Sequence, residues 1–571
     1  MVYRIADNIL SPLGMTTAEN YDALKAGRSA LCHYSSYSGM EEYDYVASRF
    51  SDEQRKKLIV PGLTWFESLV YHSAKGALED CHMTVSDYHR LVSSKQTLLI
   101  ISTTKANIEH LSSANYNTLQ PAESAHRIAK LLGISTLPIV VCNACISGVA
   151  ALVTAQRLLD TGCYNTAIVV GCDVLNHFIV SGFQSLKAMS PNLCRPFDIE
   201  RMGLNLGEAA ATMILSTNKP QHFGWQIVNG AIRNDAYHIC SPSPKGEGCA
   251  SAIKYVTEGI DLQTLSAVNV HGTATMYNDQ MESKAIAASG LSDIPMNTLK
   301  GYYGHTLGAS GILETIITMC SVEQGELLPT LGFSEIGVSG RINISASPVK
   351  IGKLSFVKII SGFGGNNAAV YCSHQSSVLS PQPSLPSLVE EHCVRITPEN
   401  VIIDGKQVTI AVESDKMLTE LYKRCIGSYP KYYKMDRLSQ LGFVASELLL
   451  TQERPRRQQC SDRAVVLFNH TSSVWVDREY EQSIATDGEG YFPSPSLFVY
   501  TLPNIVCGEI ALRNGYHAET SFYIIENKNE SIMHSILTST FIDKSIQSIL
   551  TGWIDYEDDQ HFEAELKLIK R

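Results

Sequence analysis

Residues 138–148 read Pro-Ile-Val-Val-Cys-Asn-Ala-Cys-Ile-Ser-Gly. The segment opens with a β-branched apolar run, and from residue 149 to 159 apolar residues recur at helical spacing. We therefore predict a strand that turns into a helix, with Cys145 in the turn. The unpaired N–H groups and the positive dipole end of that helix favour thiolate over thiol, which makes a cysteine nucleophilic. Because the chain has 15 cysteines, Cys145 taken alone is better explained as a small buried hydrophobe than as a nucleophile.

Two histidines further along the chain lie in glycine-rich surroundings. His271 precedes Gly272 after a short apolar run, and His305 lies between Gly304 and a predicted helix start. Small neighbours allow another backbone or a ligand to approach closely. Residues 361–367 form a glycine-rich turn whose amides could face an oxyanion. Each histidine alone could be a hydrogen-bonded turn residue, but the cysteine, both histidines and the turn in this order indicate a catalytic site.

These features resemble the β-ketoacyl-acyl carrier protein synthases, the condensing enzymes of fatty acid and polyketide assembly. The resemblance covers residues 1 to about 374 and includes the opening strand, turn and first helix of that family at residues 10–14 and 24–29. The other matching motifs are Pro196-Phe197-Asp198 with Arg201, Gly203 and Gly207-Glu208; His271-Gly272-Thr273 with Thr275, Asn278-Asp279 and Glu282; Lys300 with Gly304-His305 and Glu314; and residues 362–367.

The resemblance implies a thiolase fold, in which two βαβαβ halves related by duplication stack as five layers, α-β-α-β-α. Short β-branched runs that alternate with helical stretches independently favour a layered α/β fold. Three departures from the family pattern leave the catalytic groups in place: Ala209-Ala210 where relatives have Gly-Ala, Asn366 where they have Thr, and Ser361 where many have an aromatic residue. Ser361 should widen the entrance or the acyl pocket, so the departures bear on substrate length.

The resemblance also implies the reaction. Cys145 would accept an acyl chain as a thioester, and a malonyl group on a carrier protein would then lose carbon dioxide and attack that chain. Neutral His271 and His305 would donate hydrogen bonds to the enolate. The backbone amides of Cys145 and Phe363 would form the oxyanion hole.

The remaining implied groups support the site. Lys300 would order the site around His305 and pair with Glu314, although a surface ion pair is the simpler reading of two such residues. No metal is implied, since the cysteines and histidines lack zinc-ligand spacing. No other cofactor is implied either, because the substrates would arrive on the phosphopantetheine of a separate acyl carrier protein.

Composition limits the class of protein. The chain has 571 residues, of which 44% are hydrophobic, and a net charge of −11, which argues against nucleic acid as a partner. No stretch reaches 18 uninterrupted apolar residues, so the sequence predicts no membrane span. The start of the chain is typical of a strand rather than of a signal peptide. Many cysteines without a leader indicate a cytoplasmic protein.

An acidic enzyme needs a basic patch to bind an acidic carrier protein. Arg55, Lys56 and Lys57 precede a predicted helix, in a region where relatives bind carrier proteins. A solvated helix end explains such a short basic run equally well.

A Ser/Pro-rich linker is predicted at residues 375–396, after which residues 397–571 repeat features of the first domain. Gly515 parallels Gly133, and the same register places Asn527 at the position of Cys145. No cysteine follows Cys507, and the histidine loops are absent. The second domain therefore resembles a truncated, inactive N-terminal half of a ketosynthase, similar to those of aryl-polyene and flexirubin pigment pathways. The alternative is a divergent α/β appendage.

Three functions stay open at this point. The first is the decarboxylating synthase, acting as a homodimer or with a ketosynthase-like partner. The second is a thiolase-like enzyme that condenses coenzyme A thioesters, which the pair of histidines disfavours because thiolases have a second cysteine there. The third is a non-catalytic subunit similar to a chain-length factor. Cys145 argues against it for the first domain, and it best describes the second.

Overall fold

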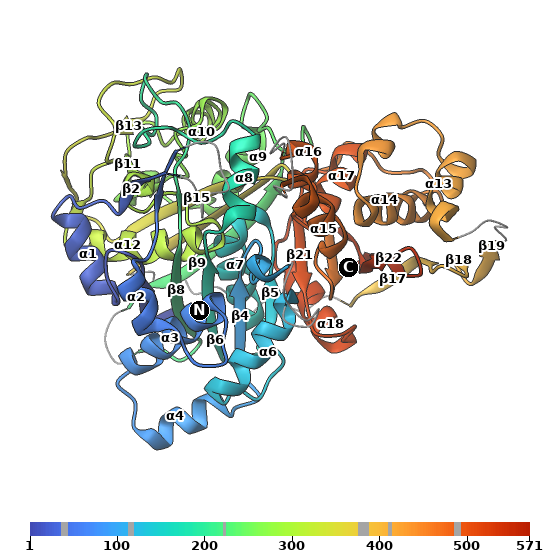
Figure 1. Ribbon diagram of the computed structural model, residues 1–571, viewed down its shortest axis with the longest axis horizontal. Helices are drawn as coiled ribbons and strands as arrows, with labels where there is room; N and C mark the ends of the chain where they lie inside the picture. The colour runs from blue at the N-terminus through green and yellow to red at the C-terminus, as the bar shows by residue number, and fades with distance from the viewer. Residues whose placement is uncertain (36–43, 112–118, 221–223, 375–386, 409–413, 485–492) are drawn as a thin grey trace.

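The part of the chain before residue 375 is built on two stacked β-sheets (Figure 1). The computed structural model describes residues 1–35, 44–111, 119–220, 224–374, 387–408, 414–484 and 493–571. The strand order of the first sheet is β5 (Ile139–Val141), β4 (Thr97–Ser102), β6 (Thr166–Asp173), β8 (Ala209–Ser216) and β1 (Val2–Leu10). The order of the second is β9 (Gln226–Asn234), β16 (Asn366–Ser373), β15 (Ser355–Gly362), β10 (Ala267–Asn269), β11 (Pro295–Asn297) and β13 (Asn343–Ile344).

Helices form the three layers around these sheets. The central layer is α7 (Ser147–Asp160) and α12 (Ser310–Glu323), which pack against both sheets. The outer layers are α3 (Trp65–Asp80) and α6 (Pro121–Leu132) on the first sheet, and α9 (Glu247–Val256) and α10 (Met276–Ala288) on the second. Strands β4, β6 and β8 are buried along their whole length because helices cover both of their faces. The five-layer thiolase fold expected from the sequence is confirmed.

The C-terminal part of the chain builds a second copy of the first sheet. Its strand order is β21 (Thr520–Ile524), β20 (Arg463–Asn469), β22 (Ser548–Asp558), β23 (His561–Lys570) and β17 (Val389–Ile396). Its helices α14 (Arg437–Leu450), α17 (Ile505–Asn514) and α18 (Glu530–Thr540) take the places of α3, α6 and α7. Helices α6 and α17 end at Gly133 and Gly515, both in the left-handed conformation with φ of 76° and 66°.

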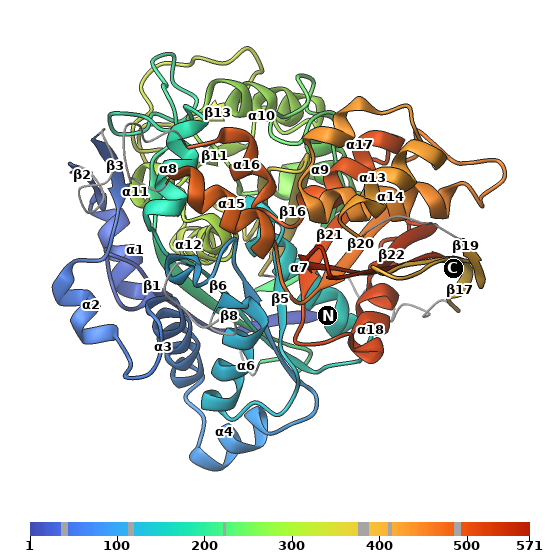
Figure 2. The same ribbon diagram turned by 45° about the vertical axis from the view of Figure 1, so that its right-hand side comes forward.

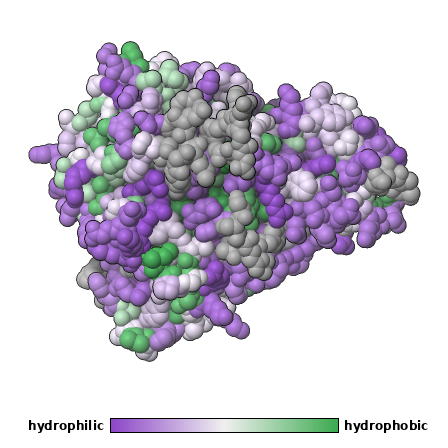
Figure 3. Space-filling view, in the orientation of Figure 1, coloured by the Kyte–Doolittle hydropathy of each residue, from purple (hydrophilic) through white to green (hydrophobic). Residues whose placement is uncertain are grey.

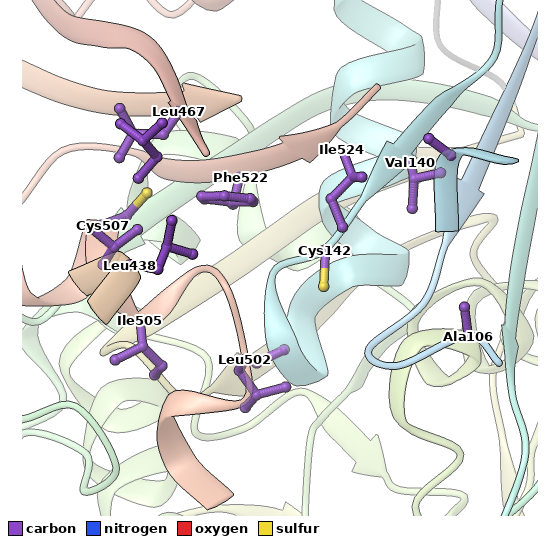
Figure 4. Packing of buried hydrophobic residues seen from close by; sticks show 14 of the residues in the cluster. Ala106, Val140, Cys142, Leu438, Leu467, Leu502, Ile505, Cys507, Phe522 and Ile524 are labelled. Atoms are coloured by element: carbon purple, nitrogen blue, oxygen red, sulfur yellow. The ribbon is translucent and has the colours of Figure 1, made fainter. Parts of the chain in front are cut away.

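The two copies meet through their equivalent edge strands. β21 lies antiparallel to β5, with Tyr523 opposite Val141, so one sheet runs through both halves (Figures 1 and 2). Antiparallel pairing of equivalent strands is the geometry of a two-fold dimer, here completed within one chain. Figure 4 shows the core continuing across this junction, where Phe522 and Ile524 lie near Val140 and Cys142. The second half of the chain thus covers the edge of β5.

Buried ion pairs also connect the halves. Their nitrogen–oxygen distances are 2.5 Å for Lys105–Asp477, 2.5 Å for Arg157–Glu519 and 2.7 Å for Arg233–Asp543. All six side chains are less than a tenth exposed. Removal of one member of a buried pair costs about 3–5 kcal/mol, because the other charge then stays buried without a partner. The junction therefore has the character of a protein core.

The linker expected at residues 375–396 ends earlier than the sequence pattern indicates. Residues 375–386 lie outside the described part of the chain, whereas Val389–Ile396 form β17, which pairs with β23. The second half thus starts at residue 389 rather than 397. The strand was missed because most of its side chains are exposed or half-buried, which leaves it without an apolar signal.

The surface is predominantly hydrophilic on the face shown in Figure 3, with hydrophobic residues in small groups. No helix in the described part of the chain has both the length and the apolar character that crossing a membrane requires.

We predict that the two halves stay associated after the connecting segment is cut. A protease site inserted between residues 376 and 386 and cleaved under native conditions should leave a complex that elutes like the intact 62.7 kDa chain, since strand pairing and buried ion pairs hold the junction. Size-exclusion chromatography with denaturing electrophoresis measures this, and chain without the site is the control. Separation into two folded fragments would contradict the prediction.

Candidate active site

Cys145 lies where the sequence places it, in the turn between β5 and α7. The turn is a short 3-10 helix, η2 (Ala144–Ile146), and Ala144 adopts an unusual positive φ of 50°. Gly362 presses against the turn from β15, since a Cβ at that position would lie 3.1 Å from the Cys145 amide nitrogen. The close approach of these two backbones explains why a glycine begins the turn at residues 362–365.

The His271 loop follows β10 and is held through its backbone. The N–H groups of His271 and Gly272 donate to the carboxylate of Glu282 at 2.6 and 2.9 Å. The hydroxyl of Thr298 donates to the His271 carbonyl at 3.0 Å. The imidazole Nδ1 of His271 has no hydrogen-bond partner, so the ring is free to exchange a proton.

His305 follows the short helix α11 (Lys300–Tyr303), and its tautomer is set by its neighbours. The Leu307 N–H donates to His305 Nδ1 at 3.3 Å, and the Ser310 hydroxyl lies 3.0 Å from the same nitrogen. Because Nδ1 accepts, the proton of the neutral ring is on Nε2. Nε2 is buried without a partner and can donate a hydrogen bond to a substrate oxygen.

The structure brings Cys145, His271 and His305 together. Their thiol and ring nitrogens lie within 4.8 Å of one another, and the two rings meet edge to face with centroids 5.1 Å apart. Among the described residues, this is the cluster of Cys, His, Asp or Glu side chains compact enough to hold a metal ion. A thiolate and imidazoles are donors that Zn²⁺ accepts, so the expectation of a metal-free site stays a prediction.

Burial governs the protonation of this trio. It raises the pKa of the Cys145 thiol to about 12, although Lys300 and the backbone amides of Cys145 and Phe363 act in the opposite direction. The expectation that the helix end favours a thiolate is therefore wrong for the resting enzyme, because loss of water outweighs the helix end. Burial and the nearby lysines hold the pKa of both His271 and His305 well below the ordinary value. All three groups are neutral at rest.

A cavity of about 380 Å³ reaches the trio from the surface. Its walls include Phe183, Leu186 and Ser361, and exposed Met202 and Tyr277 belong to the same lining. An aromatic side chain in place of Ser361 would take up part of this space.

The second half of the chain supports the turn beside the trio. The side-chain amide of Asn504 donates to the Phe363 carbonyl at 3.0 Å, and the Thr520 hydroxyl bonds Asn366. The bond to Thr520 gives a reason for the departure at Asn366. The ring of Phe363 stacks on Phe183, with centroids 6.3 Å apart.

Lys300 and Glu314 form a buried ion pair at 2.6 Å, not a surface pair. Lys358, which was not predicted as a site residue, is fully buried on β15 and bonds the other Glu314 oxygen. A lysine inside the apolar run Phe356-Val357-Lys358-Ile359-Ile360 was the signal that could have found it.

The expected carrier-docking residues are not equally available. Arg55, on α2 (Asp52–Leu58), bonds the buried carboxylate of Glu208 at 3.1 Å and lies over Trp65. Lys56 is exposed, and exposed Lys57 pairs with Glu53 at 2.7 Å. None of the three basic residues lines the cavity.

The second half has no thiol where the first half has Cys145. Asn527 lies between β21 and α18, as Cys145 lies between β5 and α7. Its neighbour Lys528 pairs with Glu563 and Glu565. This turn therefore offers no nucleophile equivalent to Cys145.

Comparisons with known families and sequences agree on one class of protein. Residues 81–221 match the model of the β-ketoacyl synthase N-terminal domain, and residues 226–334 match that of the C-terminal domain. A putative mitochondrial 3-oxoacyl-[acyl-carrier-protein] synthase of Schizosaccharomyces pombe is 29% identical over 292 residues, which cover 47% of this chain and 68% of the relative. The 3-oxoacyl-[acyl-carrier-protein] synthase 2 of Staphylococcus aureus is 29% identical over 247 residues, which cover 40% of this chain and 61% of the relative.

Solved structures share the fold. The ketosynthase ApeO in complex with its chain length factor ApeC, from Xenorhabdus doucetiae, gives a TM-score of 0.57 at 23% identity, covering 66% of this chain and 98% of that chain. The PfaC keto synthase-chain length factor gives a TM-score of 0.75 at 14% identity, covering 100% of this chain and 78% of that one. The second comparison therefore includes the C-terminal half.

Alkylation should reveal the raised pKa of Cys145. We expect its rate of reaction with iodoacetamide to rise about tenfold per pH unit between about pH 7 and 10, because only the thiolate reacts. Mass spectrometry of the peptide that contains Cys145 measures this rate, with exposed Cys163 as the reference for the reagent. A plateau of the Cys145 rate below pH 8 would show a stabilised thiolate and contradict the burial argument.

Proposed function

We propose that this chain, which belongs to the β-ketoacyl synthase family, condenses an acyl chain held on Cys145 with a malonyl group delivered by an acyl carrier protein. The observation that carries the proposal is the trio itself: a thiol and two imidazoles within 4.8 Å of one another at a cavity that reaches the surface. The setting is fatty acid, polyketide or aryl-polyene-type synthesis. The enzyme needs no cofactor of its own, and its cysteine-rich composition fits the cytoplasm.

In the first half-reaction, the Cys145 sulfur attacks the carbonyl carbon of the acyl-carrier thioester. The thiol proton is transferred to the carrier sulfur as that sulfur leaves, because burial makes both imidazoles weak bases. Negative charge on the carbonyl oxygen is stabilised by the amides of Cys145 and Phe363. The intermediate collapses to the Cys145 thioester, and the carrier leaves as a thiol that holds the former Cys145 proton.

In the second half-reaction, the malonyl thioester oxygen accepts hydrogen bonds from the imidazoles, including His305 Nε2–H. The electrons of the bond to the carboxylate form an enolate as carbon dioxide leaves. The enolate carbon attacks the acyl carbonyl on Cys145, and the Cys145 thiolate departs and takes up a proton from solvent through the cavity. Neutral histidines suit this step, because a neutral imidazole can be buried away from water and still donate a hydrogen bond to the enolate oxygen.

The proposed role of the second half is to hold the site rather than to catalyse. Its contacts support this role, since Phe522 N–H donates to the Asn143 side chain at 2.7 Å, two residues before Cys145. Asn504 holds the Phe363 carbonyl in the same way. The thiolase alternative is less well supported, because His305 completes the trio where a thiolase has a second cysteine.

Substitutions should separate the two half-reactions. Cys145→Ala should lower acyl transfer at least about 10³-fold, because the nucleophile is absent. His271→Ala and His305→Ala should lower malonyl decarboxylation by about 10²–10³-fold while Cys145 acylation falls less. Carbon dioxide release and intact-protein mass spectrometry measure the two steps. Thioester formation on Cys145→Ala protein would identify another nucleophile, and equal loss of both steps in the histidine variants would refute the division of roles.

Carrier docking is proposed at Lys56 and Lys57, since Arg55 is held by Glu208. The double variant Lys56→Glu/Lys57→Glu should lower kcat/KM with acyl carrier protein about tenfold at low salt and less at high salt, because the attraction is screened. Reaction with a small pantetheine thioester should stay unchanged. The matched control is Lys130→Glu/Lys254→Glu, which changes the net charge equally at two exposed sites. An equal defect in both double variants would exclude a specific patch.

A further inference from the structure

Lys358 is a buried charge that the proposed reaction leaves unused. It lies on β15, four residues before Gly362, and its side chain is fully shielded from water. Burial lowers the pKa of the Lys358 ammonium to about 8, against the attraction of Glu314. A charged group in such surroundings is costly unless its contacts hold it there, so those contacts indicate what it does.

The contacts form a line of alternating charge behind the two histidines. Lys300 and Lys358 bond the two different carboxylate oxygens of Glu314. Although burial raises the pKa of Glu314, the two ammonium groups hold it below the ordinary value. Glu282 lies close enough for its charge to interact with Lys358, and burial raises the pKa of this carboxyl to about 7.

Each end of this line belongs to one histidine loop. Glu282 accepts the backbone N–H groups of His271 and Gly272, so it fixes the position of the first loop. Lys300 begins α11, the helix that ends immediately before the second loop with His305. Lys358 bonds the Glu314 carboxylate and interacts electrostatically with that of Glu282.

We propose that Lys358 is a positioning residue that connects the His271 and His305 loops through Glu282 and Glu314 and keeps a positive charge beside both imidazoles. This proposal rests on the proposed function for its catalytic meaning, but its electrostatic effect is measurable without turnover. The charge of Lys358 disfavours an imidazolium at either position, which preserves neutral hydrogen-bond donors in mildly acidic solution.

Other ionisable groups lie on the elements packed around the site. They include Cys145 on η2, Asp173 at the end of β6, Lys187 after α8, Asp235 after β9, Asp279 and Glu282 on α10, Lys300 on α11 and Glu314 on α12. Lys300 and Lys358 are the cations that lower the pKa of both imidazoles, next after burial itself. Loss of Lys358 therefore removes one of two cations and raises the pKa of both histidines.

The test is the pH dependence of histidine modification by diethyl pyrocarbonate, which reacts with neutral imidazole. In Lys358→Met protein, the midpoints for His271 and His305, followed by peptide mass spectrometry, should move up by about 0.5–1 pH unit. Lys358→Arg, which keeps the charge, should stay close to wild type. The acid limb of kcat/KM for malonyl decarboxylation should move in the same direction as the modification midpoints.

A matched control separates this effect from loss of stability. Lys105 is also buried and ion-paired, with Asp477 at the junction, so Lys105→Met should lower Tm without moving either midpoint. Unchanged midpoints in folded Lys358→Met protein would overturn the proposal. If Lys358→Met does not fold, Glu314→Gln tests the proposal instead. Loss of this carboxylate should move both midpoints down, and unchanged midpoints in that variant would also overturn the proposal. If the variants show the expected midpoint shifts but wild-type protein does not decarboxylate malonyl thioesters, the proposed function is refuted and the role of Lys358 is not.

Discussion

The antiparallel pairing of β5 with β21 is the interaction on which the rest of the structure depends. An edge strand leaves a row of N–H and C=O groups without partners, and β5 would be such an edge in the first half alone. The strand that satisfies it also reaches the catalytic turn, since Phe522 bonds both Cys142 and the side chain of Asn143. The same hydrogen bonds that join the halves therefore fix the approach to Cys145.

Exclusion of water sets the chemistry of the site. Cys145, His271 and His305 are all buried, and each is neutral at rest because its charged form would lose hydration. The permanent charges lie behind them, on Lys300, Glu314 and Lys358, where opposite charges neutralise one another. The neutral imidazoles can stabilise the negative charge that develops on a substrate oxygen, because the ordered ion pairs beside them already hold these hydrogen-bond donors in place.

Features with a local signature could be predicted from the sequence. The strand-to-helix turn at Cys145, the glycine-flanked histidines and the correspondence of Gly133 with Gly515 each depend on a few neighbouring residues. The family resemblance that the motifs carry implied the five-layer fold. The raised pKa of Cys145 could not be predicted, because burial comes from distant elements. Asn504 and Lys358 were missed for the same reason, since only the folded chain brings them to Phe363 and Glu314. The first strand of the second half escaped because its exposed side chains lack an apolar pattern.

The two halves have also adjusted to each other's side chains. Gly182 lies within α8 (His177–Ser185), where a glycine costs about 0.5–1 kcal/mol relative to alanine. The ring of Phe498, from the second half, occupies the place where a side chain would be, since a Cβ on Gly182 would lie 2.1 Å from it. The same ring packs against Phe183, which stacks on Phe363 beside the catalytic trio. A glycine that is unfavourable in its own helix is thus explained by the second half, and the first half is a catalytic unit shaped to this one partner.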